Sequence, residues 1–156
     1  MRLNICAVGK LRRGPESELI GDYATRIERS GRSLGLGPLT IHEVEDRKGG
    51  GMAAEALVLE RAIPAGSMLC SLDERGKMMT SPDFAATLAR LRDDGARELT
   101  FLISGADGLD PDLRAKADLS LSLGRMVWPH MLARVMLTEQ LYRAISILAG
   151  SPYHRD

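Results

Sequence analysis

The sequence predicts an α/β fold with a mostly parallel sheet, and three observations support this prediction. Short apolar runs typical of buried strands alternate along the chain with longer segments whose apolar residues recur at helical spacing. Glycine and proline clusters separate these segments and predict turns. No linker, internal repeat or low-complexity segment interrupts the pattern, so residues 1–156 are expected to form a single domain. An alternation of strands and helices is typical of a parallel sheet covered by helices.

The first half of the chain supplies two predicted strands and two predicted helices. Residues 3–8 (LNICAV) form an apolar run that reads as a buried strand, and residues 39–44 (LTIHEV) alternate as a strand should. Residues 15–30 between them predict a helix, because their apolar residues share one stripe at helical spacing. Residues 52–63 predict a second helix, which a proline and a glycine end.

The second half contributes three more strands and three more helices. A helix over residues 81–92 is expected, because Ser-Pro-Asp provides an N-cap, a proline at the first position and an acidic first turn. The remaining elements follow from apolar runs and turn residues. Strands are expected at residues 67–72, 101–104 and 119–123, and helices at residues 111–118 and about 129–148.

The last predicted helix is apolar around most of its circumference instead of along one stripe. A helix of this kind is buried on more than one side. The last helix of a chain of 156 residues would normally face water on one side. We therefore expect a partner subunit to cover it, most economically a two-fold copy of the same chain.

The charge composition gives no global attraction for nucleic acid. Lys and Arg number 21, as do Asp and Glu, so RNA binding would depend on local basic patches. Residues 9–14 (GKLRRG) and 46–51 (DRKGGG) are candidates for such patches. Each reads either as a solvated, flexible loop or as a contact to RNA phosphates.

The cysteines and the apolar runs restrict the class of protein to which the chain can belong. Cys6 and Cys70 each lie in an apolar strand-like run, which predicts buried reduced thiols. No CxxC or HxxxH spacing occurs, so no metal site is expected. No apolar run approaches the ~18 residues of a membrane span, and the N-terminus lacks a secretory signal. A cytoplasmic location is the expectation.

Two glycine-containing loops in the last third of the chain are the candidate ligand site. Residues 104–108 (SGADG) and 123–128 each follow a predicted strand, and strand ends of open α/β sheets are the usual ligand edge. Glycine there lets the backbone approach a ligand closely, although a plain turn is the alternative. Neither loop carries a Walker A or GxGxxG pattern, which disfavours a nucleotide-dependent enzyme.

Several side chains near these loops and at the terminus are candidates for chemistry. His130 and Arg134 lie four residues apart near a helix start and form either an anion site or a surface pair. Trp128 is a core or interface residue or a stacking platform. The ending SPYHRD places an aromatic ring, a histidine and an arginine together, which suits a nucleotide base and its phosphate; a frayed terminus is the alternative.

The same segments resemble a known family. LISGADG, SLGRMVWPHMLARVMLTEQLYRA and the terminal SPYHR closely resemble the ribosomal RNA large subunit methyltransferase H family. The AVGK start, the Leu72-Asp73 pair and the chain length fit the same family, so the resemblance spans the whole chain. The family belongs to the SPOUT class of α/β-knot methyltransferases, which are dimers. It methylates the N3 nitrogen of a pseudouridine in large-subunit (23S) ribosomal RNA with S-adenosylmethionine as donor.

The resemblance implies a C-terminal trefoil knot, a homodimer and a donor site at the loops singled out above. It places the methyl donor at Leu72, Ser104, Gly105, Gly108, Leu123, Gly124, Arg125, Met126, Val127 and Trp128. Ser104 stands where the family commonly has glycine, so its side chain must point away from the donor or hydrogen-bond to it. No metal and no membrane are implied.

The resemblance also implies roles for the polar residues. His130, Asp107 and His154 are the available bases for the proton that leaves the ring nitrogen. Arg134 and Arg155 are candidates for phosphate or oxyanion contacts. Tyr153, His154 and Arg155 gain a catalytic role if the tail of one subunit closes the site of the other.

Two alternatives remain at this point. One is an RNA-binding or ribosome-associated module without catalysis, and the other is a SPOUT methyltransferase with a different RNA target. The net charge of zero favours a target presented by a structured particle such as the assembled ribosome, because electrostatic affinity for free RNA would be small.

Overall fold

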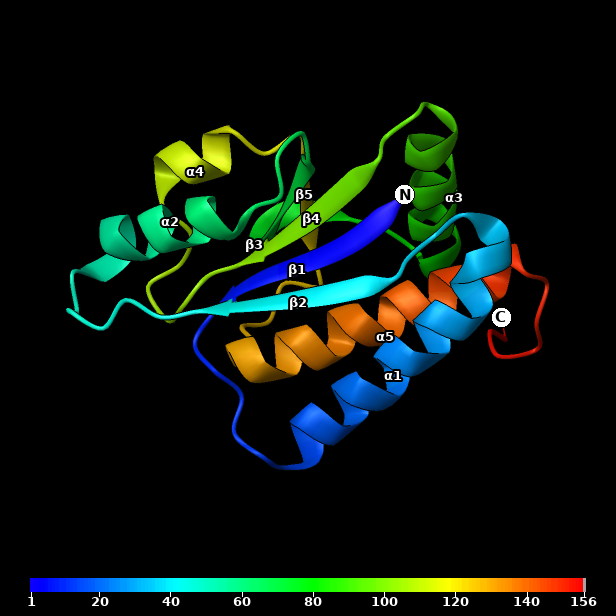
Figure 1. Cartoon of the computed structure of the whole chain (residues 1–156), viewed down its shortest axis with the longest axis horizontal. Helices are drawn as coiled ribbons and strands as arrows, with labels where there is room; N and C mark the ends of the chain where they lie inside the picture. Colours follow the sequence, from blue (N-terminus) through cyan, green and yellow to red (C-terminus); the bar gives the residue numbers. More distant parts are fainter. Residues whose placement is uncertain (156) are drawn as a thin grey trace.

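The computed structural model describes residues 1–155 as three layers, with a five-stranded sheet between two groups of helices (Figure 1). The strands are β1 (Arg2–Val8), β2 (Leu39–Val44), β3 (Met68–Met78), β4 (Glu98–Ile103) and β5 (Leu119–Ser122). The helices are α1 (Pro15–Gly31), α2 (Gly51–Ala62), α3 (Ser81–Asp93), α4 (Pro111–Ala115) and α5 (His130–Leu148), with a short 3-10 helix at Arg32–Leu34. The strand order is β2-β1-β4-β3-β5, and every paired neighbour runs parallel. The predicted α/β fold with a mostly parallel sheet is confirmed, and the trefoil knot stays a prediction.

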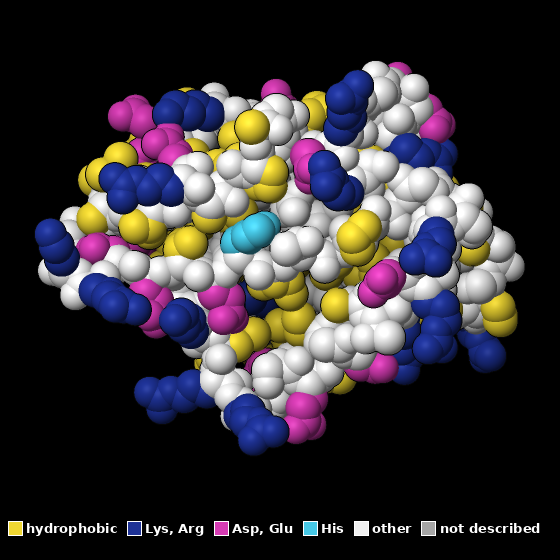
Figure 2. Space-filling model, viewed as in Figure 1, with side chains coloured by type: hydrophobic (Ala, Val, Ile, Leu, Met, Phe, Trp, Pro, Cys, Tyr) yellow, Lys and Arg dark blue, Asp and Glu magenta, His cyan; other side chains and the backbone are white. Residues whose placement is uncertain are grey.

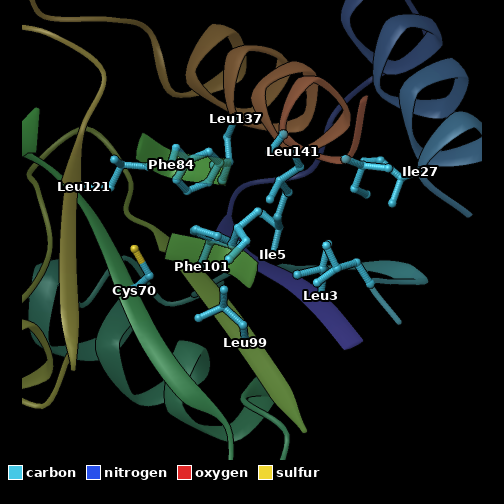
Figure 3. Packing of buried hydrophobic residues seen from close by; sticks show 14 of the residues in the cluster. Leu3, Ile5, Ile27, Cys70, Phe84, Leu99, Phe101, Leu121, Leu137 and Leu141 are labelled. Atoms are coloured by element: carbon cyan, nitrogen blue, oxygen red, sulfur yellow. The ribbon is translucent and has the colours of Figure 1, made fainter. Parts of the chain in front are cut away.

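Each face of the sheet has its own hydrophobic core. On one face, Leu3, Ile5 and Phe101 of the central strands pack with α1, α3 and α5, and Figure 3 shows Leu137 and Leu141 of α5 above them. On the other face, side chains that alternate with these pack against α2 and α4; they are Cys6, Val8 and Leu102. Because both faces are covered, β1 reads in the sequence as a continuous apolar run instead of an alternating one.

β3 continues six residues beyond the predicted strand at 67–72, and this difference shapes the site. Leu72 and Lys77 both pair with Leu121 of β5, so residues 73–76 bulge out of the sheet between them. The strand can rejoin β5 only because residue 76 is glycine: a Cβ on Gly76 would lie 2.6 Å from the carbonyl carbon of Leu121. Residues 73–76 are mostly polar, and the sequence therefore predicts a loop after residue 72 instead of a longer strand.

Smaller boundary differences have local polar causes. β4 begins at Glu98 instead of at residue 101, because the Asn4 side chain donates a 2.8 Å hydrogen bond to the otherwise costly Glu98 carboxylate. The N-cap of α3 is Thr80, one residue before the predicted one, since its hydroxyl accepts a hydrogen bond from the backbone N–H of Asp83. α4 ends at Ala115 instead of at residue 118.

The chain itself covers much of the apolar circumference of α5. This helix packs between α1, α3 and the sheet, which accounts for apolar residues on three of its sides. Large apolar side chains remain exposed at its start, where Met131 is 38% and Leu132 is 41% exposed. The expected partner subunit would cover this end of α5. None of the helices among residues 1–155 is long and apolar enough to cross a membrane.

Both cysteines are buried free thiols, as the sequence predicted, and burial raises the pKa of each to about 12. We expect neither thiol to react with a disulfide reagent at pH 8 in the folded protein, and both to react after denaturation. A pKa raised above its unfolded value means that the folded state holds the proton more tightly. The free energy of unfolding should therefore keep this contribution below pH 9 and lose it as the pH rises toward 12.

Urea denaturation at a series of pH values measures this loss. The matched control is the variant with both Cys6→Ala and Cys70→Ala, in which the part of the slope due to the thiols should disappear. An identical slope in the two proteins would contradict the assignment.

Candidate functional site

A cavity of about 590 Å³ opens at the bulge of β3 and at the carboxyl ends of β4 and β5. This volume lies within the range of small-molecule and cofactor sites. The cavity brings together the two loops that the sequence singled out, residues 104–108 and 123–128. Nine of the ten predicted donor residues line it: Leu72, Ser104, Gly105, Gly108, Leu123, Gly124, Met126, Val127 and Trp128. The tenth, Arg125, is exposed and lies outside the lining.

The loop after β4 approaches its neighbours closely. It closes with a hydrogen bond from the backbone N–H of Gly108 to the carbonyl oxygen of Gly105, at 3.3 Å. A Cβ on Gly105 would lie 2.8 Å and 2.9 Å from the two carboxylate oxygens of Glu55 on α2. Glycine at this position therefore lets the loop pack directly against the Glu55 carboxylate.

The bulge of β3 supplies a polar wall that the predicted site did not include. Asp73 accepts a hydrogen bond from the backbone N–H of Arg75 at 2.8 Å and forms an ion pair with Arg114 of α4 at 3.2 Å. Burial alone would raise the pKa of Asp73, but these two contacts together lower it. Asp73, Arg75 and Arg114 all line the cavity. Their place after a strand was a signal for Asp73 and Arg75, whereas nothing in the sequence marked Arg114.

Two of the three candidate bases lie at the cavity. His130 lines it from the first residue of α5, and Asp107 lines it from the loop after β4. The Nε2 atom of His130 also lies 3.7 Å from the position of a Cβ on Gly9, at the end of β1. The third candidate, His154, does not line the cavity of its own chain.

Arg134 lies outside the cavity and is fully buried. Its guanidinium donates hydrogen bonds to the Glu43 carboxylate at 2.9 Å and to the carbonyl oxygens of Val8 and Gly9 at 2.8 and 2.9 Å. Burial lowers the pKa of Arg134, and the Glu43 charge acts in the opposite direction. These contacts tie α5 to the ends of β1 and β2. The structure therefore gives Arg134 a role in packing and no contact with a ligand in this cavity.

The C-terminal tail is ordered against its own chain. The Tyr153 hydroxyl donates to Glu139 at 3.0 Å and lies 3.4 Å from the Tyr23 hydroxyl of α1. Arg143 lies 4.9 Å from the centre of the Tyr153 ring, and its Nη1 is 3.2 Å from Nδ1 of His154. Burial, followed by the hydrogen bonds to Tyr23 and Glu139, raises the pKa of Tyr153. Tyr153 and His154 are thus held on α5 instead of forming a frayed end, and Arg155 is exposed.

A second cavity of about 540 Å³ lies beside the residues that contact the C-terminal tail. Tyr23 and Glu139, which hold Tyr153, line this second cavity. Leu123 and Gly124 line both cavities, so the loop after β5 forms a wall between them.

The loops after β1 and β2 carry the basic residues predicted as RNA contacts. Lys10, Arg12 and Arg13 are exposed in the first loop, and Arg47 and Lys48 in the second. Figure 2 shows Lys and Arg side chains around the left and lower left of the molecule, where these loops lie in Figure 1, with acidic side chains among them. Within residues 1–155, no three His, Cys, Asp or Glu side chains are placed to hold a metal ion.

Sequence comparisons extend over the whole chain. A family model described as "Predicted SPOUT methyltransferase" matches residues 1–154. The chain is 65% identical to the protein named ribosomal RNA large subunit methyltransferase H of Roseobacter denitrificans, with complete coverage of both chains. It is 62% identical to the protein of the same name of Paracoccus denitrificans, again over 100% of both chains.

One solved structure shows the same type of fold at low sequence identity, and a second aligns less well. A probable methylase family protein from Haemophilus influenzae aligns with a TM-score of 0.52 and 13% identity, over 99% of this chain and 70% of that one. The SpoU methyltransferase AviRb from Streptomyces viridochromogenes, solved with AdoMet, aligns with a TM-score of 0.45 and 18% identity. That alignment covers 96% of this chain and 59% of AviRb.

The buried position of Arg134 predicts a large effect on stability. Arg134→Met should lower the free energy of unfolding by about 3–5 kcal/mol, because Glu43 and two carbonyl oxygens lose a buried cationic donor. Urea denaturation at one fixed protein concentration measures this change. The matched control is Arg90→Met, which breaks an exposed 4.0 Å pair with Asp94 and should change stability by less than about 0.5 kcal/mol. Similar effects of the two substitutions would rule out the packing role.

Proposed function

We propose that this chain, a member of the SPOUT methyltransferases, methylates the N3 nitrogen of a pseudouridine in 23S ribosomal RNA. Through its full-length relatives, the chain belongs to the ribosomal RNA large subunit methyltransferase H family. One observation carries the proposal. The loops that resemble the donor site of the family lie together in one cavity of suitable size, in a chain that is 65% identical over its whole length to a protein with this name.

The residues at the cavity fit S-adenosylmethionine as methyl donor. Gly108 and Gly124 line the cavity with open space where a Cβ would lie, which leaves room for a ligand edge, and Leu72 and Val127 offer apolar surface to an adenosine. Carboxylates of Asp73 and Glu55 lie at or beside the wall and suit a cationic ligand. When bound, the donor supplies a methyl group activated by the positive charge of its sulfonium.

The residues of the chain then have three tasks. The loops at 104–108 and 123–128 fix the donor, and orientation of donor and acceptor contributes up to roughly 7–11 kcal/mol to the rate. Methylation would form a bond from N3 to the methyl carbon and break the sulfur–methyl bond of the donor, so that S-adenosylhomocysteine leaves and the N3 proton passes to a base. His130 and Asp107 are the groups at the cavity that can accept the released proton.

We place the acceptor side of the site at the interface of a homodimer. Tyr153 and His154 are ordered but lie away from the cavity of their own chain, so they can serve the cavity of a second copy. Val127 at the cavity is 83% exposed and Met126 is 72% exposed, and with the exposed start of α5 they form apolar surface that a copy would cover. Arg155 then lies where it can contact a phosphate of the RNA.

The substrate is RNA within the large subunit, most economically on the assembled ribosome in the cytoplasm. The zero net charge argues against strong electrostatic capture of free RNA, and the exposed basic loops after β1 and β2 supply local phosphate contacts. The two alternatives are a non-catalytic ribosome-binding module and a methyltransferase with another RNA target.

Calorimetry with S-adenosylmethionine tests the donor site, and we expect one site per subunit. Mass spectrometry of ribosomal RNA from cells that lack the protein tests the target, and one methyl group on a pseudouridine of 23S RNA should be missing. Donor binding with an unchanged RNA would point to a different target. Absence of donor binding would favour the non-catalytic module.

Removal of residues 153–156 should separate the two halves of the site. We expect methylation to fall below detection while the Kd for S-adenosylmethionine stays within about twofold, because the tail does not line the donor cavity of its own chain. Donor titration and methylation of purified ribosomes measure the two effects. Equal loss of both activities would contradict this division.

A further inference from the structure

Glu55 is a carboxylate that the folded chain leaves unsatisfied. Its Oε2 atom is buried and has no hydrogen-bond partner among the residues that the structure describes. Glu55 as a residue is half-buried, but a buried oxygen without a hydrogen-bond donor is costly, and folded proteins rarely keep one without a purpose. Glu60, further along the same helix, shows the ordinary solution, since it forms an ion pair with Lys116.

The Glu55 carboxylate lies against the wall of the first cavity. Both of its oxygens are within 3 Å of the position that a Cβ on Gly105 would occupy, at 2.8 and 2.9 Å. Gly105 lines the cavity, and so does Met52, which precedes Glu55 by three residues and shares its face of α2. Glu55 itself does not line the cavity, so the unsatisfied oxygen lies behind Gly105, on the side of α2 and next to the proposed donor site.

The chemistry of the carboxylate specifies the group that would satisfy it. A buried carboxylate needs a hydrogen-bond donor as well as a positive charge. A sulfonium carries charge but no N–H or O–H, whereas an ammonium group provides both. S-adenosylmethionine has an ammonium group on its amino-acid part, and a carboxylate at hydrogen-bond distance would read that part of the molecule.

We propose that Glu55 recognises the amino-acid part of the methyl donor by accepting a hydrogen bond from its ammonium group. This inference rests on the proposed function, because it assumes that the first cavity holds S-adenosylmethionine. It assigns Glu55 a binding role that its position in the middle of a helix does not indicate. The oxygen that has no hydrogen-bond partner among the described residues would then gain one in the complex.

The test compares Glu55→Gln with the matched control Glu60→Gln, which removes a carboxylate from the same helix at an exposed ion pair. Three probes are titrated by calorimetry. S-adenosylmethionine carries both cations, S-adenosylhomocysteine keeps only the ammonium group, and 5′-methylthioadenosine keeps neither. A charge-assisted hydrogen bond corresponds to about tenfold or more in Kd.

Glu55→Gln should weaken the binding of the first two probes by about tenfold or more and leave 5′-methylthioadenosine within about twofold. Glu60→Gln should leave all three unchanged. The free energy of unfolding of the ligand-free Glu55→Gln protein should equal or exceed that of the wild type, because the unsatisfied charge is gone. This measurement also shows that the variant folds.

Two results would overturn the inference. Unchanged affinity for all three probes would show that Glu55 contacts no part of the donor. Equal weakening of all three would show that Glu55 supports the loop at Gly105 instead of binding the ammonium group. If the wild type binds none of the probes, the proposed function itself fails, and that result is separate from the other two.

Discussion

The parallel direction of all five paired strands is the constraint on which the site depends. Each strand must end at the same edge of the sheet, so loops that are far apart in the sequence meet there. The cavity forms where the bulge of β3 meets the loops after β4 and β5. The buried guanidinium of Arg134 fixes the adjacent ends of β1 and β2 to α5, which begins at the cavity with His130.

Two glycines allow close approaches that shape this arrangement into a site: Gly76 to the backbone of Leu121, and Gly105 to the side chain of Glu55. Gly76 lets β3 rejoin β5 after the bulge at residues 73–76, and the bulge turns Asp73 toward Arg114 at the cavity wall. Gly105 lets the loop after β4 pack on the Glu55 carboxylate. At Gly76 the backbone of Leu121 leaves no space for a side chain, whereas at Gly105 a side chain would displace the Glu55 carboxylate.

The sequence predicted the parts of the molecule that local patterns control. The apolar run of β1, the turn residues between elements and the two loops at residues 104–108 and 123–128 were all recognisable. The extension of β3 was not, because its polar residues pair with β5 through a register shift that only the folded sheet defines. The intramolecular partners of Arg134 and Tyr153 could not be predicted, because they come from β1, β2 and α1, which no local pattern connects to these residues. Glu55 carried no signal, since an acidic residue in a helix is usually solvated.

The loop after β5 has a further consequence through Leu123 and Gly124, which face both cavities. Because this loop lines both cavities, it cannot move to accommodate a ligand in one cavity without changing the shape of the other. The binding of a ligand in the second cavity, beside the tail contacts, is thereby coupled to the binding of a ligand in the first cavity. This arrangement favours ordered binding, in which the first reactant that binds shapes the surface to which the second one binds.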